Sequence, residues 1–393
     1  MTALRSEPLV LALVTAIVFG FATVATMLGP LLLAVGREFA VPVGTVGLLA
    51  TATAVPWALG APLAGRLSDR LGRRPLMTLA LAGVGGASVL SGLAPSFEVL
   101  LATRLLAGVC GAGGPPVLLA AVGDLFPSAR RARAMGWFNM GFAMAAIGGV
   151  PLVGFVGGWL GWRAAFAGLG LVLLALAAVV RLAFPAVAPA GAPAPAAEGR
   201  PGSILGAPGL LPLLLANQLE RMLMFMVTLY LPAFLMLAYG LDMAQVAPPL
   251  ALIALGAVAG NLLGGWLADR MTRLVVFGAA ELAAGLVALG LFVGHPGLWP
   301  SVAVGIGFGL ANALGRPGML AHGSDLVPER RGAVLGLLSL TNQGGLVLGS
   351  ALGGLAVDLG GYRTLGVAAC AAGALAAVLA ARLTLQRRPR AAD

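Results

Sequence analysis

The sequence predicts an all-α membrane protein of twelve transmembrane helices, arranged as two parallel-repeat bundles of six helices. Three observations support this prediction. Hydrophobic residues make up 60% of the 393 residues and charged residues only 10%, which is typical of a chain whose solvent is lipid. The apolar residues form twelve runs of membrane-spanning length, and patterns from the first half recur in the second.

The twelve runs follow from the thickness of a bilayer, because about 20 apolar residues cross its hydrocarbon core. They lie at residues 9–35, 44–64, 75–94, 98–123, 134–158, 163–183, 209–238, 246–268, 274–293, 297–322, 333–357 and 364–384. The first run is longer than the apolar core of a signal peptide, and no A-x-A site follows it. We therefore expect it to be retained as a span.

Arginine supplies all 24 basic residues, and its distribution predicts the orientation. If both termini are cytoplasmic, 18 arginines lie in inside segments, three lie outside and three lie within spans. Cytoplasmic loops carry the excess of basic residues. We expect a multi-pass protein of the inner (plasma) membrane with both termini in the cytoplasm.

Composition also argues against several classes of function. The absence of lysine rules out a P-loop and a Schiff-base lysine. The histidines (His295, His322) and cysteines (Cys110, Cys370) lack metal-site spacing, so no metal or other cofactor is expected. The arginines form short clusters rather than a basic face, which argues against nucleic-acid binding. No nucleophile, base and orienting group occur together, so an enzyme is not expected.

The second half repeats the first at an offset of 200 residues. The matching patterns are Gly65-x-Leu67-x-Asp69-Arg70 with Gly265-x-Leu267-x-Asp269-Arg270, and Gly161-Trp162-Arg163 with Gly361-Tyr362-Arg363. The prolines of the stretch between the halves rule out a continuous helix. We expect an N-terminal bundle at 1–183, a cytoplasmic Ala/Pro-rich linker at 184–208, and a C-terminal bundle at 209–393 with a short basic cytoplasmic tail. Parallel repeats of this kind form carriers around a midplane site.

The loop between the second and third spans carries a family resemblance. It reads Gly65-Arg66-Leu67-Ser68-Asp69-Arg70-Leu71-Gly72-Arg73-Arg74. It resembles the signature loop of the major facilitator superfamily, G-x-L-x-D-R-x-G-R-R, and the whole chain resembles the drug/proton antiporter and sugar-efflux members.

Gly65 and Gly72 are expected to permit a tight turn in this loop. The resemblance implies a conformational latch, with Asp69 near the start of the eleventh span. The latch residues are Gly65, Asp69, Arg70, Gly72 and Arg73, with Asp269 and Arg270 in the second half. The alternative is that the arginines only set topology.

In the fourth span, Arg104, Gly108, Gly111 and Pro115 share one helical face and resemble the family's R-x-x-x-G motif. An arginine inside a membrane requires a water-filled cavity or a buried partner. The resemblance implies that Arg104 takes part in proton coupling. A purely structural role is the alternative.

The fifth span contains Gly149, Pro151 and Gly154, similar to the glycine-proline motif of antiporters. It departs from that motif at Val150, where glycine is usual, and Phe155 interrupts a glycine pair. Tight packing through small residues is the alternative explanation.

The seventh span carries a polar stripe at spacing i, i+3, i+4, i+7 and i+11. Its members are Asn217, Glu220, Arg221, Met224 and Thr228. Glu220 and Arg221 diverge by about 100° around the helix. We expect that they do not neutralise each other neatly and that at least one has a partner on another helix.

The resemblance implies that the first, fourth, seventh and tenth spans line the cavity. The charged groups expected around that space are Arg104, Glu220, Arg221 and Arg316. The candidates for contact with the substrate are Asn217, Arg221, Met224, Thr228, Asn312 and Arg316, and helix packing is the alternative for Asn312 and Arg316. Glu220 is the first candidate for the proton carrier, because a desolvated carboxylate can titrate near neutral pH. A fixed pairing of Glu220 with an arginine is the alternative, and Glu281 in the ninth span is the second candidate.

These features predict a secondary active transporter that works by alternating access and exports drugs or metabolites, with a proton gradient as its energy source. One alternative is a carrier of an organic anion, because three cavity arginines outnumber one glutamate. Another is a membrane sensor that does not transport its ligand. The expected partners are a small-molecule substrate, protons and the lipid bilayer, and the expected state is a monomer.

Overall fold

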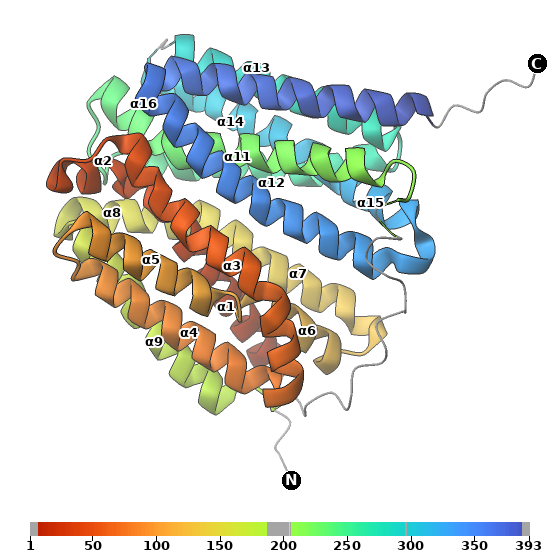
Figure 1. Cartoon of the computed structure of the whole chain (residues 1–393), viewed down its shortest axis with the longest axis horizontal. Coiled ribbons are helices and arrows are strands. Elements are labelled where there is room, and N and C mark those ends of the chain that lie inside the picture. The colour runs from red at the N-terminus through yellow and green to blue at the C-terminus, as the bar shows by residue number, and fades with distance from the viewer. Residues whose placement is uncertain (1–6, 187–203, 205, 295–296, 387–393) are drawn as a thin grey trace, which may run out of the picture. The chain divides into compact units, whose positions relative to one another are not determined.

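The computed structural model describes residues 7–186, 204, 206–294 and 297–386 (Figure 1). In this part of the chain the regular elements are helices, and no strand occurs. The prediction of an all-α membrane fold is therefore confirmed. The expected linker at 184–208 and the basic tail fall largely outside the described residues.

The chain divides into two compact units. Unit 1 comprises Met1–Val41, Leu49–Ala194 and Asp242–Ala247, and unit 2 comprises Pro42–Leu48, Pro195–Leu241 and Pro248–Asp393. Unit 1 holds α1 (Glu7–Thr26), α2 (Leu28–Phe39), most of α3 (Val43–Leu71), α4 (Arg73–Gly92), α5 (Phe97–Gly111), α6 (Pro115–Leu125), α7 (Ser128–Met144), α8 (Val150–Leu160) and α9 (Trp162–Ala183). Unit 2 holds α11 (Leu210–Tyr239), nearly all of α12 (Ala247–Ala268), α13 (Arg273–Gly294), α14 (Leu298–Leu314), α15 (Arg316–Leu326) and α16 (Arg331–Gln386).

Among the described residues, 11 helical segments are long and apolar enough to cross a membrane, where twelve runs were expected. The difference lies in α16, which contains both of the last two expected spans. Its backbone leaves helical geometry at Gly360 and Gly361, and the φ of Gly361 is 69°. Because glycine enters this region without a steric cost, the chain bends here, and Figure 1 shows the two arms of α16 in blue.

The 200-residue repeat is visible at the ends of helices. Helix α2 ends at Ala40 with φ 53°, and α11 ends at Gly240 with φ 65°; each capping N–H bonds to the carbonyl four residues earlier. Gly161 and Gly361 also match, with φ values of 84° and 69°. The offset read from the sequence therefore holds for the backbone at these turns.

The signature loop differs from the expectation at one glycine. Helix α3 continues through Gly65 to Leu71, and the turn is made at Gly72 alone, where φ is 92°. The expected tight turn at Gly65 is wrong, because one residue with positive φ is enough to separate α3 from α4.

A π turn, Ala145–Gly149, joins α7 to α8. The N–H of Val150 bonds to the carbonyl of Ala145, five residues earlier. Pro151 follows directly and has no N–H to continue an α-helical ladder. A π turn next to a proline is therefore a local solution to the missing hydrogen bond.

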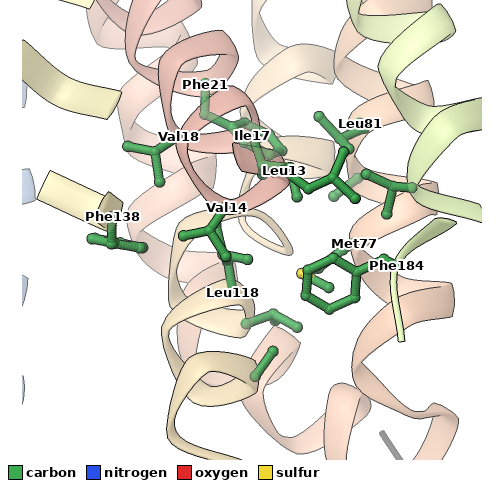
Figure 2. Close-up of a cluster of buried hydrophobic side chains, with 14 of the residues drawn as sticks. Leu13, Val14, Ile17, Val18, Phe21, Met77, Leu81, Leu118, Phe138 and Phe184 are labelled. Carbon is green, nitrogen blue, oxygen red and sulfur yellow. The ribbon is translucent and has the colours of Figure 1, made fainter. Parts of the chain in front are cut away.

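The core of unit 1 is apolar and surrounds α1. Figure 2 shows side chains from α1, α4, α6 and α7 packed together: Leu13, Val14, Ile17, Val18, Phe21, Met77, Leu81, Leu118, Phe138 and, after α9, Phe184. Because lipid tails are as apolar as these side chains, close van der Waals packing rather than removal from water stabilises the core of a membrane bundle.

Candidate functional site

In unit 2, a group of four charged side chains lies within the seventh, ninth and tenth expected spans, and we call it the charge cluster. They are Glu220 and Arg221 on α11, Glu281 on α13 and Arg316 on α15. Both glutamates are 0% exposed. Carboxylates at such depth require partners, since an isolated buried charge is costly.

Both carboxylate oxygens of Glu220 are held by arginines. Arg221 donates from Nε to Oε2 at 2.5 Å and from Nη2 to Oε1, and Arg316 donates from Nη1 to Oε2 at 3.3 Å. The expectation that Glu220 and Arg221 would not neutralise each other is wrong, because the long arginine side chain reaches both oxygens of the adjacent carboxylate. The expected partner on another helix is confirmed, and it is Arg316.

Glu281 is much less satisfied than Glu220. Its Oε2 accepts one long hydrogen bond, 3.4 Å from Nδ2 of Asn312 on α14. Its Oε1 has no hydrogen-bond partner in the described part of the chain. Arg221 and Arg316 attract it electrostatically. The cluster therefore holds two acids and two bases, whereas the sequence alone suggested one glutamate for these arginines.

The polar stripe of α11 serves two different neighbours. Asn217 donates from Nδ2 to the carbonyl of Leu338, to Thr341 Oγ1 and to Asn342 Oδ1, all on α16, at 3.1, 2.6 and 3.1 Å. Sulfur of Met224 accepts from Nη1 of Arg221 at 2.9 Å. Asn217 thus ties α11 to α16, while Met224 extends the charge cluster. Thr228 is exposed and bonds to the carbonyl of Met224.

Arg104 forms a different kind of site in unit 1. It is 3% exposed, and its Nε and Nη2 donate to Ser91 Oγ at 3.1 and 2.7 Å, with Ser88 Oγ at 3.4 Å from Nη2. Its guanidinium lies 4.9 Å from the centre of the Phe166 ring. No carboxylate pairs with it among the residues that the structure describes. The expected buried partner is therefore a pair of hydroxyl groups. That Arg104 and Glu220 line one cavity stays a prediction.

Ion pairs of the latch loops repeat in the two units. Arg73 pairs with Asp69 at 2.7 Å and with Asp124 at 3.0 Å, and Arg273 pairs with Asp325 at 2.7 Å. The sequence had signalled the second partner, since Asp124-Leu125-Phe126-Pro127 recurs as Asp325-Leu326-Val327-Pro328. These pairs were not predicted, because a role of the arginines in the latch or in topology does not require a particular ion pair.

The other latch residues have local roles in the structure. Arg270 lies over the ring of Trp266, 4.1 Å from its centre. Neither Arg70 nor Asp269 forms an ion pair with any residue in the described ranges. The latch itself stays a prediction.

The glycines of the fifth span permit close packing inside unit 1. A Cβ on Gly149 would lie 3.2 Å from the ring of Phe19 on α1, and one on Gly154 would lie 3.4 Å from Pro30 on α2. These contacts favour the packing explanation and leave the antiport role untested.

Known proteins resemble this chain over most of its length. The Major Facilitator Superfamily model matches residues 14–313 and 213–393. A chloramphenicol resistance protein of Streptomyces lividans is 30% identical over 302 residues, which cover 76% of this chain and 73% of that protein. The inner membrane transport protein YdhP of Escherichia coli (strain K12) is 28% identical, with 76% and 84% covered. The transcription regulatory protein OpdE of Pseudomonas aeruginosa is 30% identical, with 80% and 78% covered.

Solved structures share the fold. A bacterial homolog of the human lysosomal transporter Spinster, inward-facing and occupied, matches with a TM-score of 0.78 at 19% identity, covering 98% of this chain and 96% of that one. The nucleoside transporter NupG matches with a TM-score of 0.77 at 13% identity, covering 97% and 100%. At these identities the likeness concerns the fold alone.

Proposed function

Since this chain belongs to the major facilitator superfamily of membrane transporters, we propose that it exports small molecules in exchange for protons by alternating access. The chloramphenicol resistance protein among its relatives supports efflux as the direction and a small drug-like molecule as the substrate.

The charge cluster is the observation that carries the proposal. Charged side chains inside spans are costly, and they commonly mark ion or substrate pathways. Here Glu220, Arg221, Glu281 and Arg316 come from three helices of one unit. Replacing such a group by apolar residues is often neutral or stabilising, so folding alone does not account for it.

Glu281 is a better candidate than Glu220 for the group that gains and loses the proton. Protonation of Glu220 would weaken three hydrogen bonds from two arginines. Protonation of Glu281 would cost one bond of 3.4 Å. This order reverses the ranking suggested by the sequence, and Glu220 becomes the fixed partner of the arginines.

The charge balance suggests how proton and substrate are coupled. With Glu281 ionised, the two glutamates neutralise the two arginines. With Glu281 protonated, the cluster carries one net positive charge and loses an acceptor for a polar or cationic substrate group. Proton uptake then lowers the affinity for the substrate and favours its release.

Flux in proteoliposomes tests the assignment, with radiolabelled chloramphenicol as the probe and an imposed pH gradient as the driving force. In Glu281→Gln we expect gradient-driven accumulation to fall by at least about tenfold, while exchange of labelled for unlabelled chloramphenicol persists, because exchange needs no change of protonation. Glu98→Gln, at an exposed position of α5, is the matched control and should match the wild type. If gradient-driven accumulation per amount of folded protein survives in Glu281→Gln and is lost only in Glu220→Gln, the proton carrier is Glu220 rather than Glu281.

A sensor is the second candidate, because one relative, OpdE, is named a transcription regulatory protein. A sensor would bind its ligand without moving it. Binding of chloramphenicol to purified protein with neither uptake nor exchange in the same proteoliposomes would favour this function.

Competition by anionic rather than neutral or cationic compounds would favour the carrier of an organic anion.

A further inference from the structure

Unit 2 has an open cleft of about 480 Å³ at the end where α11 and α13 finish and α16 bends. We call it the aromatic cleft. Its lining includes Phe234 of α11, Phe292 of α13, and Gly360 and Tyr362 of α16. The rings of Phe292 and Tyr362 stack at 6.0 Å, and Phe234 lies 5.1 Å from Phe292 and 5.3 Å from Tyr362. The cleft thus has a preformed aromatic wall.

Two polar groups at this wall lack partners. The hydroxyl of Tyr362 is buried and has no hydrogen-bond partner in the described part of the chain. Arg363 also lines the cleft. It is exposed and forms no ion pair with the residues described. A buried tyrosine hydroxyl usually finds a partner, so the arrangement calls for an acceptor close to both groups.

The matching place in unit 1 contains that acceptor. At the end of α2, Glu38 accepts a hydrogen bond from Nε1 of Trp162 at 2.5 Å and pairs with Nη2 of Arg163 at 2.7 Å. Trp162 and Arg163 correspond to Tyr362 and Arg363, and Glu38 corresponds to Ala238. The caps at Ala40 and Gly240 establish this register.

Unit 2 therefore keeps the aromatic residue and the arginine, but at the position of Glu38 it has Ala238, which lines the cleft. We propose that the aromatic cleft binds an anionic amphiphile. Its carboxylate or phosphate takes the place of the Glu38 carboxylate, between the Arg363 guanidinium and the Tyr362 hydroxyl, and its apolar body lies on Phe234 and Phe292. The volume of the cleft is in the range of small-molecule sites.

This site is separate from the charge cluster. Phe234 follows Glu220 by fourteen positions on α11, which corresponds to about 21 Å along the helix axis. The binding site and the transport function can therefore succeed or fail independently.

Calorimetric titration of the purified full chain in phosphatidylcholine nanodiscs tests the proposal, with 1-naphthoate as the probe and neutral 1-naphthamide as its isostere. We expect naphthoate to bind at least about tenfold more tightly than naphthamide, because charge-assisted hydrogen bonds are the strong ones. Arg363→Gln should weaken naphthoate binding about tenfold, and Tyr362→Phe should weaken it by a smaller factor. Arg163→Gln, the matching change in unit 1, should leave it unchanged.

Ala238→Glu is the most direct variant, since it places the carboxylate of unit 1 into unit 2. It should abolish naphthoate binding and raise the melting temperature, because the introduced carboxylate would pair internally with Arg363. Equal binding of naphthoate and naphthamide, or wild-type affinity in both Arg363→Gln and Ala238→Glu, would overturn the proposal. The melting temperature shows that each variant is folded.

The same titration separates two sources of the anion. In nanodiscs that contain phosphatidylglycerol, a lipid headgroup that occupies the cleft would weaken naphthoate binding in the wild type and not further in Arg363→Gln. An affinity that does not depend on phosphatidylglycerol would assign the cleft to a soluble carboxylate or phosphate. Either result supports an anion site.

Discussion

Matching positions of the two halves hold opposite chemistry. In unit 1, Ile17 and Leu81 belong to the apolar core (Figure 2). Two hundred residues later the same positions hold Asn217 and Glu281, and Phe21 corresponds to Arg221. These positions are buried in helices of both units, so a buried helical position in this repeat does not itself require a charge. Their presence in only one half points to function rather than to architecture.

Unit 1 also has a buried charge that unit 2 lacks. Unit 1 buries Arg104 where unit 2 has Val304. Each unit therefore buries positive charge, but unit 2 neutralises it with carboxylates and unit 1 surrounds it with hydroxyl groups. The proposed proton site therefore lies in unit 2, where buried carboxylates accompany the buried arginine.

The largest expected effect comes from Glu220→Gln. It removes the only carboxylate hydrogen-bonded to Arg221 and Arg316 in the described residues and leaves one buried and one partly buried cation, so we expect a loss of about 3–5 kcal/mol of stability. Thermal unfolding of the purified protein in detergent measures it. The double variant Glu220→Gln/Arg221→Gln should recover part of the loss. A single variant as stable as the wild type would show that the cluster is solvated in a way that the contacts do not reveal.

Arg104→Gln should have a smaller effect, about 1–3 kcal/mol, because it leaves hydroxyl groups rather than an ion without a partner. Ser91 Oγ also bonds to the carbonyl of Ala87 at 2.8 Å and so stays satisfied. The same unfolding measurement applies, with Arg104→Lys as the control that keeps the charge. A loss as large as that of Glu220→Gln would remove the distinction between the two kinds of site.

Glu38→Ala should cost about 1–2 kcal/mol, since it breaks one charge-assisted hydrogen bond and one half-exposed ion pair. Trp162 would then keep a buried N–H without its acceptor. The melting temperature should fall, while that of Ala238→Glu should rise. Shifts of the same sign in both variants would contradict the equivalence of the two helix ends.

The smallest effects concern the latch loops, where the repeated ion pairs differ in burial. The Arg73 side chain is 10% exposed and that of Arg273 is 36% exposed. We expect Arg73→Gln to lower stability by about 1 kcal/mol and Arg273→Gln to give no resolvable change. Equal losses in the two variants would show that burial does not control the strength of these pairs.

The spans and the repeat could be predicted from the sequence, because apolar runs are local features and the repeat appears when the sequence is compared with itself. Apolar runs of about 20 residues need no tertiary information, and Gly161 and Gly361 mark the same turn in both halves. The helix breaks within spans, such as that at Met27, leave no gap in hydrophobicity, so they were not predicted.

The candidate site was harder to predict because its partners come from different helices. The polar stripe on α11 identified Glu220 and Arg221. Helical spacing gives the direction in which each side chain leaves the helix, but it does not show how far an arginine side chain reaches. Glu281 stands alone in an apolar helix, so only tertiary packing brings it near Arg221. The place of Arg73 beside Asp124 could have been found, since both residues recur in the second half.

The π turn at Ala145–Gly149 gives the fifth span an unusual tolerance of length. It contains one residue more than an α-helix needs to connect the same two ends. Deleting one residue there would restore regular α-helix while Gly141 still faces Val18 and Gly154 still faces Pro30. The same deletion elsewhere in the span would rotate everything beyond it by about 100°. This span therefore has a defined position where chain length can vary without loss of its packing faces.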